Sequence, residues 1–399
     1  MDFYLLAVIV FVILVIVFIY IDRKNYVRES ILLLRKTKKG RGILNNISKS
    51  CPNFWKYVGI VGVIVGFLIS IWTVYLLIDL TIINFTIETP IQGIGLVLPS
   101  PTAEPVVGPG FYGVPLFYWI IAIVVLMLVH EGSHGIMALR DKVKIKSIGW
   151  GVFIVIPLAF VEIDEKHLEK KGKWAQLRVY GAGSFANFVT AFVCLIIMIS
   201  VFTPLYQPAG VRFTGLMEGY PAEKVNLTGI IVGIDDYQIQ TVEDLNAALI
   251  EAGVGKEISV YTNVSGDINE FRLTTVKDPD KGSEKGFIGI AFAGSPNARM
   301  LKPEASYLEG LIVFFEGMFY WLFLINFGVG AFNLLPIRGL DGGKMWEIFA
   351  LRLMERKKKR LSFMKQKKRE ERAKSIMNYA TWAMLFILAL NFLLIFRVF

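Results

Sequence analysis

The chain has 399 residues, of which 54% are hydrophobic, and it carries a formal net charge of +10. This composition excludes an ordinary soluble protein with a single core and indicates repeated membrane crossing. The basic residues lie between apolar segments, where they face cytoplasm and anionic lipid, so nucleic acid is not an expected partner. Only two cysteines occur, Cys51 in a basic loop and Cys194 in an apolar segment, and they predict no disulfide framework.

Six segments are long and apolar enough to cross a bilayer, which takes about 20 residues of helix. They are residues 3–21, 57–79, 114–138, 178–203, 307–335 and 377–398. No basic stretch precedes the first segment and no small-residue cleavage site follows it, so we expect a retained anchor. The sequence therefore predicts an α-helical polytopic membrane protein with about six transmembrane helices.

The connections between these helices differ in charge. The loop after the first helix and the stretches 140–173 and 352–374 are basic, whereas residues 80–113 contain no Lys or Arg. By the positive-inside rule the basic connections are cytoplasmic, so the N-terminus of this integral multi-pass protein is expected outside the cell membrane. The unbroken basic run 356–360 is interpreted as a solvated, lipid-facing loop, with partner binding as the alternative.

Residues 205–295 have the pattern of a small external α+β domain, with an alternating strand at 257–262 and a helix-like run at 242–252. The segment that begins Gly215-Leu-Met-Glu-Gly-Tyr-Pro resembles a PDZ domain. Such domains hold an extended peptide by strand addition, which suits a substrate filter that binds a substrate tail. A structural cap without a ligand is the alternative.

Residues 147–163 are apolar and glycine-containing but too few to span a bilayer as a helix. One interpretation is a membrane-associated, re-entrant β-hairpin beside the active cavity, and the other is a surface-lying apolar loop.

These segments divide the chain into five regions. They are the two-helix region 1–110, the membrane core 111–204 with the hairpin, the PDZ-like domain 205–295, the core helix 296–346, and the basic loop and last helix 347–399.

The strongest chemical signal is His130-Glu131-Gly132-Ser133-His134 near the end of the third predicted helix. Residues four apart share one helix face, so both imidazoles can reach one metal ion, while Glu131 can accept a proton from water there. Ionisable groups at bilayer depth cost about 2.5–3.5 kcal/mol each, and a metal offsets that cost. A satisfied polar cluster between helices is the alternative. Counting about 1.5 Å per residue, His130 lies nearer the cytoplasmic face. His167, the third histidine, receives no role.

A third metal ligand is expected from Asp341, which follows the fifth predicted helix. Pro336 and the glycines after it interrupt helical hydrogen bonding and allow the chain to turn back. The inward direction of this helix brings Asp341 to the depth of His130. The alternative for Asp341 is a helix-capping role. Other acidic candidates that lack the bend are Glu316, Glu162 and Asp164.

Together, H-E-G-S-H at 130–134 and N-L-L-P-I-R-G-L-D-G at 333–342 resemble the site-2 protease family of intramembrane metalloproteases. A third match is Gly181-Ala-Gly-Ser-Phe-Ala-Asn187. The resemblance implies that His130, His134 and Asp341 bind one Zn²⁺ per chain and that Glu131 is the general acid/base. It also implies that Asn333 donates a hydrogen bond to the substrate backbone or oxyanion, and that Asn187 acts similarly or ties helices together.

The predicted function is therefore the cleavage of transmembrane segments of membrane-anchored substrates. A substrate helix hides its carbonyls, so we expect it to unwind into a strand against the hairpin, after trimming on its external side.

Two other functions use the same residues. One is a metal transporter with a transit site, against which the lack of an inverted repeat argues. The other is a non-catalytic PDZ scaffold that keeps a structural metal.

Overall fold

The computed structural model describes residues 3–29, 32–37, 40–87, 93, 95–153, 156–264, 266–279, 285–292, 295–355 and 363–396. The chain forms two compact units, which we call the helical unit (Met1–Ile197 with Phe315–Phe399) and the inserted unit (Met198–Phe314). The basic run 356–360 lies outside the described residues.

The described part of the chain contains six helices with the length and composition of membrane spans, which confirms the predicted number. The long helices are α1 (Phe3–Asp22), α3 (Pro52–Thr86), α4 (Leu116–Arg140), α6 (Lys173–Ile197), α9 (Glu309–Asn333) and α11 (Phe363–Ile395). Shorter helices are α2 (Arg41–Ser50), α5 (Glu165–Glu169) and α10 (Asp341–Glu355). These apolar helices make the chain an integral membrane protein.

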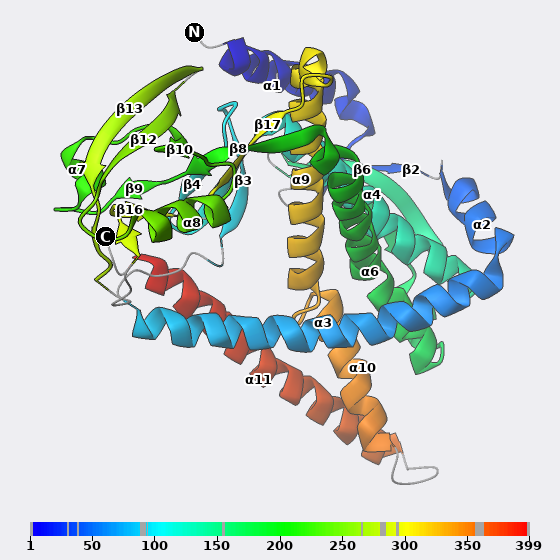
Figure 1. Cartoon of the computed structure of the whole chain (residues 1–399). Helices are drawn as coiled ribbons and strands as arrows, with labels where there is room; N and C mark the ends of the chain where they lie inside the picture. Colours follow the sequence, from blue (N-terminus) through cyan, green and yellow to red (C-terminus); the bar gives the residue numbers. More distant parts are fainter. Residues whose placement is uncertain are drawn as a thin grey trace. The chain divides into compact units, whose positions relative to one another are not determined.

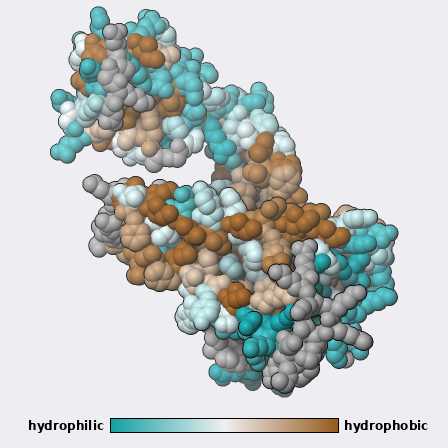
Figure 2. Space-filling model, turned by 90° about the horizontal axis from the view of Figure 1, so that it is seen from below, coloured by the Kyte–Doolittle hydropathy of each residue, from teal (hydrophilic) through white to brown (hydrophobic). Residues whose placement is uncertain are grey.

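Apolar side chains cover much of the face of the molecule that Figure 2 shows. Each long helix of the helical unit carries large exposed hydrophobic residues, among them Leu14, Leu68, Leu128, Phe192 and Phe386. In water such a surface would be an aggregation hazard, whereas in a bilayer it is matched to the lipid tails.

Small residues set the packing of α3 against α6 in the helical unit (Figure 1). Gly59, Gly62 and Gly66 are buried on one side of α3. A Cβ atom at Gly62 would lie 3.2 Å from the ring of Phe185 on α6, so the glycines let the two backbones approach closely. Asn391 of α11 donates to the carbonyl of Leu77 at 3.2 Å and ties α11 to α3.

The predicted hairpin is present and belongs to a larger sheet. Strand β6 (Ile145–Phe153) pairs antiparallel with β7 (Ile156–Ile163). Strands β1 (Val27–Glu29) and β2 (Leu32–Thr37), from the segment expected to be only a basic loop, extend the sheet in the order β1-β2-β6-β7. The segment is therefore a strand pair and not an irregular loop, and β7 forms an edge of the sheet. Whether the sheet is re-entrant or lies on the membrane surface stays a prediction.

A second small sheet precedes α4 in the segment without basic residues. It has the order β3-β5-β4, with bounds Leu96–Ser100 for β3, Val106–Gly108 for β4 and Phe111–Pro115 for β5. Trp119 on the first turn of α4 donates to the carbonyl of Val97 at 3.3 Å. This bond joins the start of α4 to the sheet and helps to fix the helix that carries His130.

The inserted unit is an α+β structure around its own apolar core. The main sheet has the order β13-β12-β10-β8-β17, with β11 paired to β10. The strand bounds are β8 (Tyr206–Arg212), β10 (Ile230–Ile234), β11 (Tyr237–Gln238), β12 (Glu257–Val264), β13 (Asp267–Thr274) and β17 (Asn297–Leu301). Smaller elements are α7 (Pro221–Lys224), α8 (Val242–Ala252), β9 (Gly215–Leu216), β14 (Val276–Lys277), β15 (Gly286–Phe287) and β16 (Ile290–Ala291).

The sheet of the inserted unit extends beyond the predicted region 205–295, because β17 starts at Asn297. Its last residue, Leu301, is paired with Tyr206, the first residue of β8. The amide of Lys302 also donates to the carbonyl of Leu205 at 2.9 Å. The chain therefore enters and leaves the sheet at neighbouring points.

Candidate metal centre

The two histidines of α4 point their Nε2 atoms at each other and at Asp341. The Nε2 atoms of His130 and His134 are 3.2 Å apart. The Oδ2 atom of Asp341 lies 3.1 Å from the Nε2 of His134 and 3.3 Å from that of His130. Both histidines are buried, and the side chain of Asp341 is 15% exposed. Within the described residues this is the one group of three His, Cys, Asp or Glu side chains arranged to hold a metal ion.

Asp341 reaches the histidines because the chain turns sharply after α9. Residues 334–340 form the turn, in which Gly339 has φ +101°. A Cβ atom at Gly342 would lie 2.0 Å from the carbonyl oxygen of Leu334, and one at Gly343 would lie 2.1 Å from that of Ile337. Only glycine fits both positions, so the first turn of α10 can fold directly against the preceding backbone with Asp341 as its first residue.

The other ring nitrogens of the two histidines also have partners, and both partners belong to α6. The Nδ1 of His134 lies 2.7 Å from the carbonyl oxygen of Val179. The Nδ1 of His130 lies 3.0 Å from the Nδ2 of Asn187, which is fully buried. Such second contacts orient an imidazole and decide which of its nitrogens faces a metal.

Helix α6 approaches the cluster closely at Gly183. A Cβ atom at this position would lie 2.4 Å from the Nε2 of His134 and 2.8 Å from the Nε2 of His130. Val179, Gly183 and Asn187 are four residues apart and lie on one face of α6. One face of α6 therefore leaves room for both imidazoles and holds them from behind.

This donor set fits zinc. Ligand atoms about 2.1 Å from a tetrahedral zinc ion are about 3.4 Å apart, close to the separations of 3.1–3.3 Å in the cluster. Two imidazoles and a carboxylate leave a fourth position for water or substrate, as in catalytic sites. His130, His134 and Asp341 would thus hold the ion.

Glu131 makes its described contact away from the cluster, with the edge of the hairpin sheet. Its Oε2 accepts a hydrogen bond from the amide of Val161 on β7 at 3.1 Å. One turn earlier on α4, the sulfur of Met127 accepts from the amide of Ala159 at 3.2 Å. Two outward-facing amides of β7 are therefore occupied by side chains of α4.

Asn333 is the last residue of α9 and is partly buried. Within the part of the chain that the structure describes, no hydrogen bond joins it to the cluster. Among the acidic alternatives, Glu162 accepts from Ser147 at 2.6 Å and Asp164 caps α5. His167 accepts from the amide of Lys144 at 3.4 Å. Neither these residues nor Glu316 belong to the cluster.

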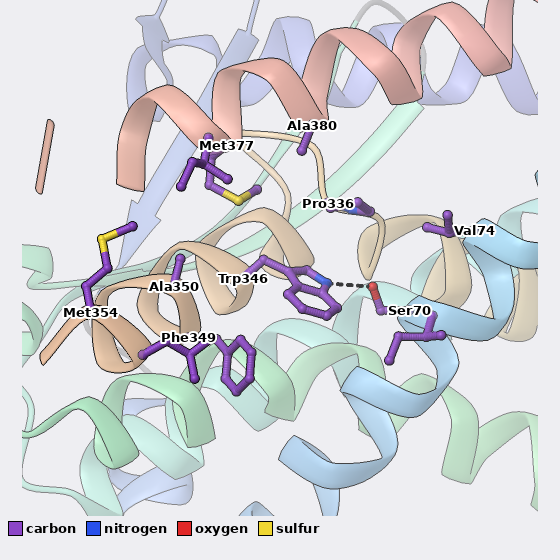
Figure 3. A pocket seen from close by; sticks show the side chains of 12 residues that line it. Ser70, Val74, Pro336, Trp346, Phe349, Ala350, Met354, Met377 and Ala380 are labelled. Carbon is purple, nitrogen blue, oxygen red and sulfur yellow. Dashed lines mark hydrogen bonds between the residues drawn. The ribbon is translucent and has the colours of Figure 1, made fainter. Parts of the chain in front are cut away.

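An apolar cavity of about 760 Å³ lies between α3, α10 and α11 (Figure 3). At its wall, Trp346 donates to the hydroxyl of Ser70 at 2.8 Å, and Ser70 donates to the carbonyl of Leu334 at 2.6 Å. The three residues of the metal cluster are not among those that line the cavity. The two bonds nevertheless matter for the cluster, because they anchor the turn that precedes Asp341.

Comparison with known proteins agrees with this geometry. The model of peptidase family M50 matches residues 118–390, more than half of the chain, including α4, α6, the turn and Asp341. The chain belongs to peptidase family M50. This finding confirms the resemblance to site-2 proteases, and M50 members are zinc-dependent membrane metalloproteases. A relative of this M50 chain is the uncharacterized protein MJ0971 of Methanocaldococcus jannaschii, 27% identical over 364 residues, or 90% of this chain and 88% of the relative.

Several residues that shape the centre of this M50 protein were not predicted from sequence. Gly183 makes room for the two imidazoles, and Gly342 lets α10 fold against the preceding turn. The Val179 carbonyl orients His134, and Ser70 anchors the turn. The spacing of Gly183 and Asn187 on one helix face was a usable signal. Ser70 gave none, because a serine in an apolar helix is common and its partner is 264 residues away.

Proposed function

We propose that the chain is an intramembrane zinc endopeptidase that cleaves transmembrane segments of membrane-anchored substrates. The cluster of His130, His134 and Asp341 carries this proposal, because it presents three zinc-type donors to one point inside an apolar helical unit. Membership of family M50 supports it. Zinc, when bound, would polarise the scissile carbonyl and lower the pKa of a coordinated water.

Glu131 is the proposed general acid/base. It follows His130 directly, so its side chain leaves α4 beside the metal ligands. In this role its carboxylate takes a proton from the attacking water and returns it to the leaving amine. Asn333 at the end of α9 is the proposed donor to the substrate backbone or oxyanion.

The substrate is proposed to bind as a strand at the edge formed by β7. Peptide bonds in a helix are hydrogen-bonded internally, whereas strand addition exposes one carbonyl to the metal. At Ala159 and Val161 the edge amides are bonded to Met127 and Glu131. An incoming strand would replace both side chains, and this exchange would free Glu131 for proton transfer.

The inserted unit is proposed to be a PDZ-like domain that filters substrates outside the cytoplasm. Its sheet, α8 and the small pair β9–β16 support this fold. The pairing of Tyr206 with Leu301 permits a clean excision, in which a short glycine linker joins Leu205 to Lys302. We expect this variant to cleave untrimmed and pre-trimmed substrates with equal preference. A preference that stays unchanged would remove the filter role.

The proposed topology places the N-terminus and the inserted unit outside the cell membrane and the metal cluster nearer the cytoplasm. His130 lies 14 residues into α4, about 21 Å along a helix that starts at the external side. Cysteine accessibility in intact cells tests this topology. Cys51, the exposed residue between α2 and α3, lies in the region predicted to be cytoplasmic and should react only after permeabilisation.

The central experiment uses purified full-length protein and a panel of single-span peptides, with and without a chelator. Glu131→Gln should keep zinc and lose about 100-fold or more of the turnover, as expected for a general acid/base. Retained turnover in Glu131→Gln, or turnover that survives metal removal, would contradict the proposal. Zinc flux into proteoliposomes would instead favour a transporter.

A further inference from the structure

We propose that Asn187 is a positioning residue that fixes His130 in the form able to bind the metal. In this form the side-chain oxygen of Asn187 accepts a hydrogen bond from the Nδ1–H of His130, and the Nε2 lone pair faces the ion. The inference rests on the zinc site proposed above. It assigns Asn187 a role through His130, in place of the contact with substrate that the family resemblance suggests.

The first observation is a buried oxygen without a partner. Asn187 has no exposed surface, and its Oδ1 makes no hydrogen bond to the described residues, whereas its Nδ2 lies 3.0 Å from the Nδ1 of His130. Because Oδ1 has no bond to lose, the amide can turn without breaking a contact of the oxygen. A half-turn about the Cβ–Cγ bond exchanges the two amide atoms and places Oδ1 against the imidazole.

The second observation concerns which ring nitrogen of His130 carries the proton. A neutral histidine that offers Nε2 to a metal must carry its proton on Nδ1, which then needs an acceptor. His134 has this acceptor in the carbonyl of Val179 at 2.7 Å. For His130 the described polar partner at Nδ1 is the amide of Asn187. Metal binding therefore selects the orientation in which Asn187 accepts.

The third observation is the fit of α6 to both rings. Gly183, one turn before Asn187, has no room for a Cβ atom between the helix and the imidazoles. At this close approach the short side chain of asparagine reaches His130 directly. Asn187 thus does for His130, with a side chain, what the backbone of Val179 does for His134.

The test measures zinc affinity by chelator competition in the full-length protein in detergent, without any cleavage assay. Asn187→Leu removes the acceptor and should lower zinc affinity about 10–100-fold, the usual effect of losing an outer partner of a metal-binding histidine. Asn187→Asp retains an acceptor oxygen and should stay close to the unsubstituted protein. The matched control is Asn326→Leu, because Asn326 is equally buried but bonds within α9 to Leu322.

A second measurement needs no variant. In zinc-loaded protein labelled with ¹⁵N-histidine, the Nδ1–H of His130 should exchange slowly with solvent, and only three histidines have to be assigned. An Nδ1–H of His130 that exchanges as fast as the ring N–H of the partly exposed His167 would overturn the inference.

Two results with the variants would also overturn it. One is a zinc affinity in Asn187→Leu that matches the control, including the case in which only turnover falls, which would return Asn187 to substrate contact. The other is an equal loss in Asn187→Asp and Asn187→Leu. Failure of the proposed function is distinguishable, because the unsubstituted protein itself would then not bind zinc.

Discussion

The two regions that bring His130, His134 and Asp341 together are built in different ways. In α4 the helix period alone puts His130 and His134 on one face, whatever residues lie between them. In the turn between α9 and α10, Asp341 is placed by contacts, namely glycines pressed against carbonyl groups and a serine that anchors Leu334. A ligand from a helix should therefore tolerate changes within its own segment, such as at Gly132, whereas a ligand from a turn depends on the details of the turn itself.

The largest effect is expected from Gly342→Ala in the turn. Its Cβ would meet the carbonyl oxygen of Leu334 at 2.0 Å, and backbone cannot move aside as a side chain can. We expect the clash to cost about 3 kcal/mol in placing Asp341 against the histidines, which corresponds to about a 100-fold loss of peptidase activity. Gly328→Ala on α9, where a Cβ meets nothing within 4 Å, is the control. Equal activity of the two variants would refute the dependence of Asp341 on this turn.

Next comes Gly183→Ala, which tests how far α4 tolerates a change in its neighbour. The added methyl group would press on His134 and His130, whose rings can yield partly, so we expect zinc affinity to fall about 30-fold, or about 2 kcal/mol. Gly132→Ala lies inside the histidine motif itself but meets open space. Chelator competition should show normal zinc binding for Gly132→Ala, and a loss as large as that of Gly183→Ala would contradict the comparison.

A smaller effect is expected from Ser70→Ala, which frees the turn without crowding it. The substitution leaves the carbonyl of Leu334 and the indole N–H of Trp346 without their partner. We expect the loss of these bonds to cost about 1–2 kcal/mol in holding the turn in place, which would appear as about a tenfold lower turnover. Thr73→Val on the same helix removes a hydroxyl whose partner among the described residues is the carbonyl of Ile69 in its own helix, and it should leave turnover intact. Unchanged turnover in Ser70→Ala would show that the turn needs no anchor.

The smallest effect lies outside both regions, at the start of α8. The amides of Gln240 and Thr241 donate to Asp244, and these bonds lower the pKa of its carboxyl below 3.8. Because the folded-state pKa is the lower one, the stabilisation is present above the unfolded-state pKa and is lost as the pH falls through the folded-state value. The protection factors of α8 amides in hydrogen exchange should therefore fall below about pH 4, and Asp244→Ala should remove this pH dependence. Asp236→Ala, an exposed acid outside the helix, should leave it in place.

The sequence predicted the helices and the histidine pair because both depend on local patterns. Apolar runs longer than 18 residues indicate spans, and residues four apart indicate a shared face. It did not predict α10, although Met345 and Ile348 bury one side of it. Nor did it predict β1 and β2, whose short segments mix apolar and basic residues. They are strands because β6 offers an edge to β2, and β2 in turn offers one to β1.

The predicted position of Asp341 near the histidines followed from helix direction and from the bend at Pro336. The contacts that hold Asp341 there could not be predicted. The close approach of Gly342 to Leu334 and the bond from Ser70 to Leu334 form only when these segments meet in the folded chain. Asn187 was singled out by its motif, but the motif gives no hint of which atom of which histidine it faces. Contacts across long sequence separation decide these points.

The hydrogen bonds along the edge of β7 have a consequence for when a peptide can bind. Its outward amides at Ala159 and Val161 already donate to Met127 and Glu131 of α4, so neither amide is available to an incoming peptide. In the proposed mode of binding, a substrate strand would take the place of these side chains, and the exchange would release Glu131, the proposed proton acceptor. On the same proposal, a neighbouring membrane protein that cannot make this exchange would leave Glu131 bonded to β7 and would not be cleaved.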